Sequence, residues 1–218
     1  MKAANPEDVE RAMRNLGTVL RGDTGSLLRI SDTLSNPRYV GAREFIRAIL
    51  SGLDPEARAI YQKVVASAAE ERFRAASGEG DPAVLETVAA SYPYTPVAAR
   101  ALNKAANLYL DRGEFAQAAS ALQLLLREYR GLDGISDALA AAKLALALTR
   151  DGQIVEARAV AERLSKDFGK EPLSIGGRGT SGAEFAQQVA ARLDKGSVSS
   201  QGEAAGGVTY AGTLRRTG

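Results

Sequence analysis

Apolar side chains recur every three or four residues along most of this chain, which is the pattern of amphipathic helices. Between 95 and 169 the pattern forms two helical hairpins, with Gly113 and Gly152 at their turns. Aligning the two glycines brings Leu125 into register with Leu164. Self-similarity at a period of about 40 residues, with two helices in each unit, is typical of an α-solenoid. The pattern therefore predicts an all-α, helical-repeat fold.

The two helices of the first hairpin carry faces that can pack against each other. Small side chains allow the helix backbones to approach closely, and aromatic side chains fill the space beside the turn. These residues are the alanines at 105, 106, 118 and 119, with Tyr109 and Phe115. Asp111-Arg112-Gly113 is expected to end the first helix, because glycine enters the left-handed conformation without the steric cost of a Cβ atom.

Further helices are predicted on both sides of these hairpins. Asn5 and Pro6 form a typical helix start, with two acidic residues in the first turn. Residues 26–40 show no clear period, and we expect mostly loop there. The other predicted helices cover about residues 41–52, 55–76, 82–91 and 183–193. The pair at 55–76 and 82–91 is interpreted as a degenerate earlier repeat, because a solenoid needs about three hairpins for stability.

These predictions divide the chain into four segments. Residues 1–53 hold the N-terminal helices and a loop, and residues 54–169 hold the helical repeats. A glycine-rich loop and a final helix occupy 170–195. From 196 to 218 glycine, serine, alanine and threonine dominate. Because this last segment cannot bury enough apolar surface to fold alone, we expect it to be disordered or to form an extended strand or linker.

Composition narrows the possible functions. The chain has 218 residues, of which 45% are hydrophobic and 25% charged, as in ordinary globular proteins. A formal net charge of +2 gives no argument for a nucleic-acid partner. Cysteine and histidine are both absent, which excludes disulfides, thiolate nucleophiles, Ser-His-Asp triads and zinc sites built from these residues.

No convincing catalytic constellation remains in the sequence. The glycine-rich stretch 175–182 resembles a phosphate-binding loop, but it lacks the Gly-Lys-Ser/Thr ending and follows no predicted strand. We interpret it as a linker that begins a helix. The charged residues at 70–74 are typical of a solvated helix face. We therefore expect a protein that is not an enzyme and that holds no cofactor and no metal.

No segment of the sequence has the roughly 20 apolar residues that span a bilayer. After Met1 the chain continues directly into a polar segment, so no secretory signal is visible. Two alternatives stay open: a cytoplasmic protein, or an exported one whose signal has been removed.

The segment from Leu53 to Tyr129 resembles the N-terminal helical region of bacterial outer-compartment proteins whose C-terminal half is a pyrroloquinoline-quinone-type β-propeller. The order of Gly176-Gly177-Arg178, a short helix and the glycine-rich run at 206–218 also fits that family. The chain differs in lacking the tryptophan usual near the start of the propeller. The resemblance implies a tetratricopeptide-like domain truncated before its propeller, and a periplasmic or cell-envelope location.

A second resemblance concerns the turn before the first hairpin. Tyr92-Pro93-Tyr94-Thr95 is similar to a short sequence motif of envelope-associated tetratricopeptide proteins, of the outer-membrane assembly and cell-division coordination type. This alternative implies an adaptor that binds a peptide or protein in a concave groove. Both resemblances imply function through protein contacts.

A tetratricopeptide array binds its partners on the concave face made by the first helix of each hairpin. By resemblance, the partner-binding residues of the first hairpin are Arg100, Asn103, Asn107 and Asp111, beside Leu110, and that of the second is Arg150, beside Leu139, Ala142, Leu146 and Thr149. This face is expected either to bind a protein or peptide, with the missing C-terminal propeller as one such partner, or to be covered by the C-terminal segment or the N-terminal helices of the chain. In the second case the domain is a scaffold. The sequence does not indicate an oligomeric state.

Overall fold

The structure is a computed structural model that describes residues 6–22, 26–30, 38–175 and 178–204. Most of this part is helical, in agreement with the predicted all-α class. The helices are α1 (Pro6–Arg21), α2 (Ala42–Ser51), α3 (Pro55–Glu79), α4 (Pro82–Ser91), α5 (Pro96–Arg112), α6 (Phe115–Glu128), α7 (Asp137–Arg150), α8 (Ile154–Phe168) and α9 (Gly182–Ala204). Within the described residues, no helix combines the length and the apolar character that crossing a bilayer requires.

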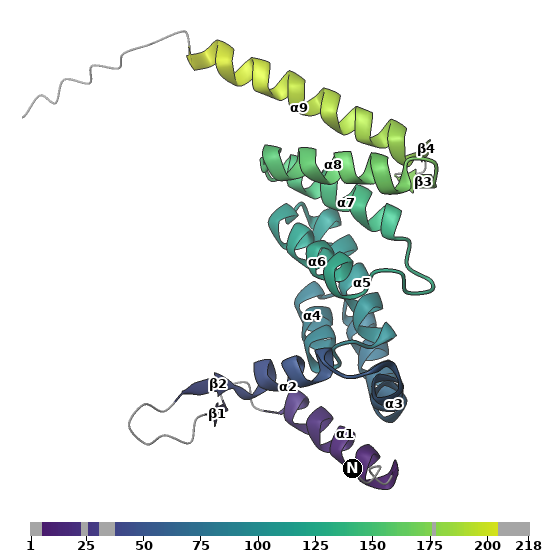
Figure 1. The fold of residues 1–218 in the computed structure, drawn as a ribbon. Coiled ribbons are helices and arrows are strands. Elements are labelled where there is room, and N and C mark those ends of the chain that lie inside the picture. The colour runs from purple at the N-terminus through teal and green to yellow at the C-terminus, as the bar shows by residue number, and fades with distance from the viewer. Residues whose placement is uncertain (1–5, 23–25, 31–37, 176–177, 205–218) are drawn as a thin grey trace, which may run out of the picture.

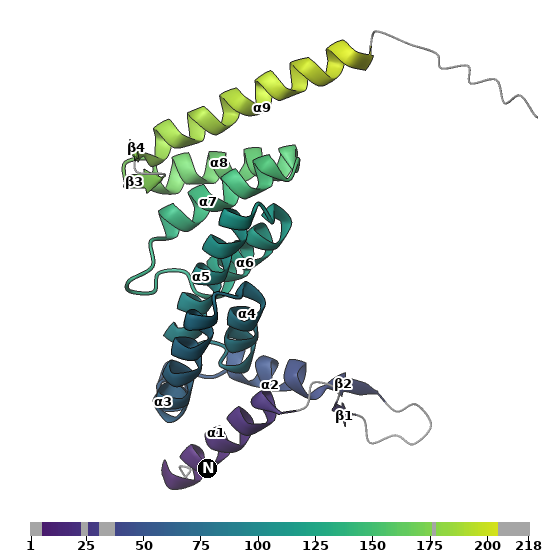
Figure 2. The same ribbon diagram turned by 180° about the vertical axis from the view of Figure 1, so that it is seen from behind.

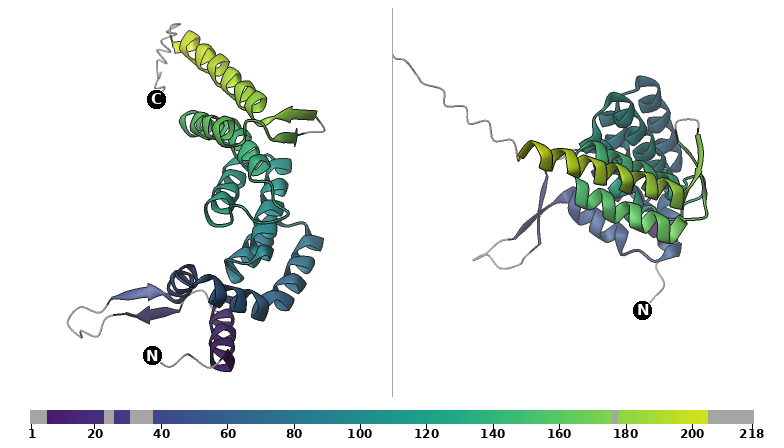
Figure 3. Two further views of the ribbon diagram at one scale, coloured as in Figure 1. Left: turned by 45° about the vertical axis from the view of Figure 1, so that its right-hand side comes forward. Right: turned by 90° about the horizontal axis from the view of Figure 1, so that it is seen from above.

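The helices form an elongated stack in chain order, with α1 at one end and α9 at the other (Figure 1). From α4 to α9, each helix packs mainly against the next one along the chain, and the view from behind shows the same order (Figure 2). At the N-terminal end α3 contacts α1, α4 and α5. At the other end α9 lies along α8 (Figure 3). The core is consequently a series of helix–helix interfaces.

Side chains fix the helix starts by accepting hydrogen bonds from backbone N–H groups that have no partner within the first turn. The carboxylate of Asp54 accepts the N–H of Ala57 at 2.8 Å at the start of α3. The hydroxyl of Thr95 accepts the N–H of Ala98 at 3.1 Å at the start of α5. A proline in the first turn follows both caps, where its missing N–H removes no helical hydrogen bond.

Glycine ends the first helix of the predicted hairpins in the left-handed conformation. Gly113 after α5 has a φ of 76° and Gly152 after α7 has a φ of 79°. A residue with a Cβ atom would be strained in this conformation at either position, which explains why glycine stands where the chain reverses. This confirms the turns that the sequence predicts at both positions.

Alanine dominates the interfaces of α5 and α7. On α7 six alanines are buried, together with Leu144 and Leu148. Because alanine adds little width, neighbouring helix backbones can approach closely while the leucines fill the remaining space. The repeating sequence pattern therefore marks helix faces that are in fact buried.

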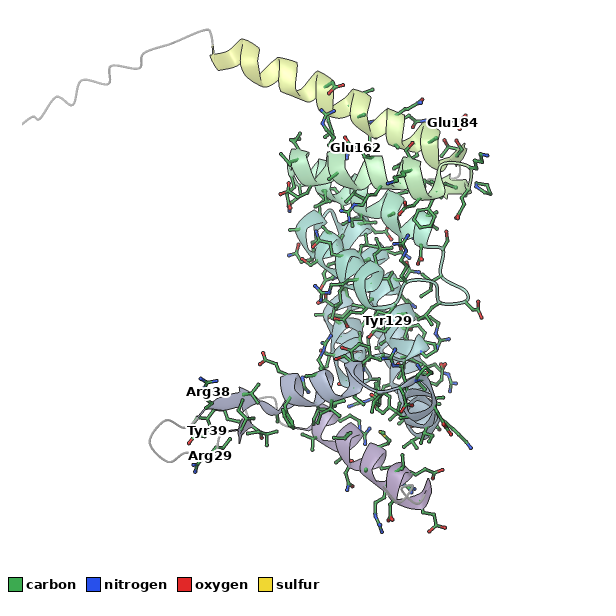
Figure 4. All side chains as sticks on the ribbon, in the orientation of Figure 1. Arg29, Arg38, Tyr39, Tyr129, Glu162 and Glu184 are labelled. Carbon is green, nitrogen blue, oxygen red and sulfur yellow. The ribbon has the colours of Figure 1, made fainter. Side chains whose placement is uncertain are left out.

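The prediction of mostly loop between 26 and 40 is wrong at both ends of that segment. Strand β1 (Leu27–Arg29) pairs antiparallel with β2 (Tyr39–Gly41), with Leu28 opposite Val40. A ladder of three residue pairs is too short to show a period in the sequence. The hairpin projects from the helix stack and carries Arg29, Arg38 and Tyr39 (Figure 4). Residues 31–37 lie outside the described residues.

The C-terminal part differs from the prediction in two respects. Strands β3 (Pro172–Ile175) and β4 (Arg178–Ser181) form a second hairpin where a glycine-rich loop was expected. Helix α9 continues to Ala204, so the expected disordered or extended tail is wrong for 196–204. Once α9 is anchored on α8, each added residue extends an existing helix, and 194–204 contain no proline that would interrupt it. The predicted cap Asn5, the Gly176-Gly177 pair and residues 205–218 lie outside the described part.

The start of α9 is positioned by a reciprocal pair of caps. The hydroxyl oxygen of Ser181 accepts the N–H of Glu184 at 3.3 Å, and the Glu184 carboxylate accepts the N–H of Ser181 at 2.9 Å. The hydrogen bond from the Ser181 backbone lowers the pKa of Glu184. At Gly182 a Cβ atom would collide with the carbonyl oxygen of Phe168, so only glycine allows this close approach of α9 to the end of α8.

Candidate functional site

A groove of about 970 Å³ lies between α5 and α7, the first helices of the two predicted hairpins. We call it the α5–α7 groove. Its walls come from the C-terminal half of α5, the start of α6, one face of α7 and strand β3. The lining residues are Asn107, Leu110, Asp111, Arg112, Gly113, Phe115, Lys143, Leu146, Arg150, Ser174 and Ile175.

Helical spacing explains why each wall presents its side chains together. On α7, Lys143, Leu146 and Arg150 follow one another at three and four residues and therefore share one face. This face places a half-buried leucine between two cationic side chains. On α5, Asn107 and Asp111 are one turn apart. The groove thus combines cations, an amide, a carboxylate and apolar surface.

Lys143 is the central polar residue of the groove. Its ammonium group donates a hydrogen bond of 2.7 Å to the amide oxygen of Asn107. Burial lowers the pKa of Lys143, and the nearby Asp111 carboxylate opposes that shift. An ammonium group that has lost part of its hydration gains from an additional oxygen acceptor. A carbonyl or carboxylate of a bound ligand would supply one.

The two outer charged residues of the groove are exposed. Arg150 and Asp111 are both exposed at the surface. Neither side chain forms an ion pair with another residue of the described chain. Arg112 is held in place, because its guanidinium donates a hydrogen bond of 2.8 Å to the carbonyl of Gly80. Arg150 and Asp111 therefore remain available to a ligand.

The structure separates the five residues that the resemblance assigns to partner binding. Asn107, Asp111 and Arg150 lie in the α5–α7 groove, whereas Arg100 and Asn103 lie outside it. The guanidinium of Arg100 pairs with the carboxylate of Glu70 and lies 4.8 Å from the ring centre of Phe73. Both partners belong to α3, which packs on α5 and engages this arginine.

The flanking residues of the second hairpin also divide. Leu146 lines the groove, while Ala142 is fully buried and Leu139 lies outside. The hydroxyl of Thr149 donates a hydrogen bond of 2.7 Å to the carbonyl of Ala145 in its own helix. The face of α7 that reaches the groove is therefore narrower than the predicted one.

Sequence reasoning missed Lys143, Phe115 and the β3 residues Ser174 and Ile175. Lys143 had a usable signal, because it precedes Arg150 by two helical turns and lies on the same face. The β3 residues had none, since they follow α8 in the chain and reach the groove only through a hairpin that packs against α7.

The chemistry of this groove suits recognition of a polypeptide. It offers hydrogen-bond donors, an amide, a carboxylate and leucine side chains. Among the residues that the structure describes, no group of three acidic, histidine or cysteine side chains could hold a metal ion.

Comparisons with protein-family models, with curated proteins and with solved structures find no match to this chain. The resemblance to the helical region of propeller proteins therefore stays a prediction.

Proposed function

We propose that this chain is a tetratricopeptide-like helical-repeat module that binds an extended segment of a protein partner in the α5–α7 groove. The observation that carries the proposal is the gathering of Asn107, Asp111, Lys143 and Arg150 around one groove. By resemblance, we include in the proposal a location in the cell envelope and attachment to a β-propeller.

The repeat arrangement is supported by the geometry of two successive hairpins. In α5–α6 and in α7–α8 the first helix is followed by a glycine at positive φ, and the second helix packs back against it. The pairs stack in chain order, and α3 and α4 precede them. Nearest-neighbour packing of similar helix pairs is the defining property of an α-solenoid.

An extended segment fits the polar character of this groove. A peptide in extended conformation exposes its backbone N–H and C=O groups, which need hydrogen-bond partners when they leave water. Lys143 and Arg150 donate hydrogen bonds, Asp111 accepts them and Asn107 does both. Leu110 and Leu146 offer apolar contact to the ligand side chains between these points.

A second candidate function, a self-covered scaffold, is favoured by one observation. Strand β3 packs against α7, and its residues Ser174 and Ile175 line the α5–α7 groove. The chain thereby occupies part of the surface that a partner would use. In this case the domain would act as a spacer that holds other parts of a larger protein apart.

Selection of peptides from a random displayed library tests the two candidates. If the groove binds extended segments, the chain should enrich related peptides, and the double variant Asn107→Ala with Arg150→Ala should lose at least about tenfold in affinity, since each broken contact is worth about 1 kcal/mol or more. Arg74→Ala on α3 is the matched control, because this arginine is also exposed and lies outside the groove.

Two results would count against partner binding in the α5–α7 groove. If peptides bind the double variant as tightly as the original chain, the binding site lies outside the α5–α7 groove. A library that yields no enriched peptide, although the original chain is folded by circular dichroism, would favour the scaffold.

A further inference from the structure

Strand β3 presents an open edge to the α5–α7 groove. Its sheet has two strands, so β4 can cover only one edge of β3. Among the residues whose side chains the structure describes, Ser174 and Ile175 of β3 line the groove, and no residue of β4 does. The uncovered edge of β3 therefore faces the groove.

The register of the β3–β4 ladder decides which backbone groups lie on that edge. In an antiparallel ladder, residue pairs that exchange hydrogen bonds alternate with pairs that do not. The N–H of Gly182 donates a hydrogen bond of 3.0 Å to the carbonyl of Glu171, so the next bonded pair is Leu173 with Thr180. Ser174, one residue further along β3, therefore points its N–H and its C=O away from β4.

These outward backbone groups have no partner in the described part of the chain. Neither the N–H nor the C=O of Ser174 forms a hydrogen bond with another described residue. Pro172, two residues earlier, points its carbonyl to the same edge and has no N–H. A sheet tolerates proline at such an edge, because the missing N–H removes no ladder bond. The edge thus offers one donor and two acceptors.

The burial pattern of β3 fixes how an added strand would lie. Leu173 is 3% exposed beside α7, whereas Pro172 and Ser174 on either side of it are exposed. The small sheet consequently has one buried face and one solvent face. A strand added to β3 would continue both faces. Every second side chain of that strand would meet Leu110 and Leu146 in the groove, and the others would point to water.

The far wall of the groove can meet the second edge of such a strand. Asn107 and Asp111 come from α5, whereas β3 packs against α7. An extended segment carries backbone N–H and C=O groups on both of its edges, and both rows need partners when the segment leaves water. The outer edge of β3 can bond one row. The side chains of Asn107, Asp111 and Lys143 can bond the other.

We propose that the extended segment bound in the α5–α7 groove pairs with β3 as a third strand and carries apolar side chains at every second position. This inference rests on the proposed function, because it concerns the same groove. It adds that the groove recognises the main chain of the ligand, through Ser174 and the carbonyl of Pro172. Ligands of different sequence should therefore bind if they share the alternating pattern.

Nuclear magnetic resonance with synthetic peptides tests this proposal. The probe is the amidated peptide acetyl-Gln-Thr-Val-Thr-Val-Thr-Gln, titrated to millimolar concentration into the full chain. Two matched probes carry N-methyl groups on the valines or on the threonines, which removes the N–H groups from one edge of the strand or from the other. We expect the Ser174 amide signal to shift on binding. At least one methylated probe should bind about tenfold more weakly, because it loses hydrogen bonds and gains bulk at the paired edge.

Variants of the protein place the pairing on β3. Ser174→Pro removes the outward N–H and keeps the ladder bonds to β4, so the hairpin should persist. This variant should weaken the probe about fivefold or more. Ser174→Ala is the matched control, because it changes an exposed side chain and leaves both backbone groups in place, and its effect should stay within about twofold. If Ser174→Pro disturbs the fold by circular dichroism, the methylated probes still decide, since they leave the protein unchanged.

The double variant Asn107→Ala with Arg150→Ala separates this inference from the proposed function. If the double variant loses the probe, while Ser174→Pro and both methylated probes bind as before, the groove takes an extended segment without pairing to β3. This inference alone is then wrong. No binding of the unmethylated probe also overturns it, whatever peptides a displayed library yields, because main-chain recognition should accept this sequence.

Two measurements on the chain alone identify a competing occupant of the edge. We expect the N–H of Ser174 to exchange rapidly with solvent when no peptide is present. Slow exchange that becomes fast after removal of residues 205–218 would assign the edge to the chain's own C-terminal segment. A dimer in sedimentation that Ser174→Pro dissociates would assign it to a second copy. Either result would overturn the proposal.

Discussion

Helix α7 contributes to two grooves that differ in the chemistry of their linings: the α5–α7 groove and a groove of about 550 Å³ between α6 and α8, the α6–α8 groove. The α5–α7 groove presents Lys143, Asn107 and Arg150, which can satisfy the backbone of an extended chain. The α6–α8 groove presents mainly leucine, valine and alanine side chains, with three arginines, Gln123, Glu156 and Asp167 among them. Opposite faces of one helix thus line two grooves with different side chains.

The largest expected effect comes from a residue in the core of that shared helix. Leu148 is fully buried, so Leu148→Ala should lower the free energy of unfolding by about 2–5 kcal/mol and disturb both grooves. Val155→Ala at an exposed position of α8 should change this free energy by no more than about 0.5 kcal/mol. Urea unfolding followed by circular dichroism measures both. Similar effects of the two substitutions would mean that the α7–α8 interface is not packed as described.

A smaller effect should come from the turn that joins α7 to α8. Gly152 has a φ of 79°, so Gly152→Ala should destabilise the protein by about 1–2 kcal/mol. The substitution should also shift α7 relative to α8. Gly78→Ala offers the matched control, because Gly78 lies inside α3 and an added Cβ atom would meet nothing within 4 Å. This control should stabilise the protein by about 0.5–1 kcal/mol. Changes of the same sign in both variants would contradict the assigned backbone conformations.

The smallest expected effect concerns the titration of Lys143. The Asp111 carboxylate raises the pKa of Lys143 against the effect of burial, so Asp111→Asn should lower that pKa further below 10.5. A titration of the lysine side chain by nuclear magnetic resonance measures it, with Asp133→Asn on the exposed α6–α7 loop as control. An unchanged pKa of Lys143 in Asp111→Asn would mean that the Asp111 carboxylate does not influence the titration of Lys143.

The lowered pKa of Lys143 also determines how the stability of the fold changes with pH. Because the pKa of Lys143 is lower in the folded chain than its ordinary value of 10.5, the unfolded chain binds more protons between the two pKa values. The contribution of Lys143 to the stability of the fold should therefore rise with pH across that window. Lys143→Met should remove this pH dependence.

The sequence predicts the helices of the two central hairpins well, for local reasons. Gly113 and Gly152 mark turns that require positive φ, and Thr95 caps a helix that begins with proline. Each of these signals acts within a few residues, so it can be read without knowledge of the rest of the chain. The β1–β2 ladder and the length of α9 carried no comparable local signal.

Part of the candidate groove followed from periodicity, and part depended on distant packing. Asn107 and Asp111 share a face of α5 at helical spacing, which the sequence displays. Arg100 shares that helix, yet α3 engages it through Glu70 and Phe73. Ile175 reaches the groove from beyond α8. Contacts between segments so far apart in the chain leave no trace in the spacing of residues.

The order in which the helices pack also determines how the molecule would respond to mechanical force. Since each helix from α4 to α9 packs mainly against its chain neighbour, tension applied between the two ends passes through these interfaces in series, and each bears the same force. No single interface has to break before the others can extend. The chain would lengthen stepwise, beginning at its weakest helix pair.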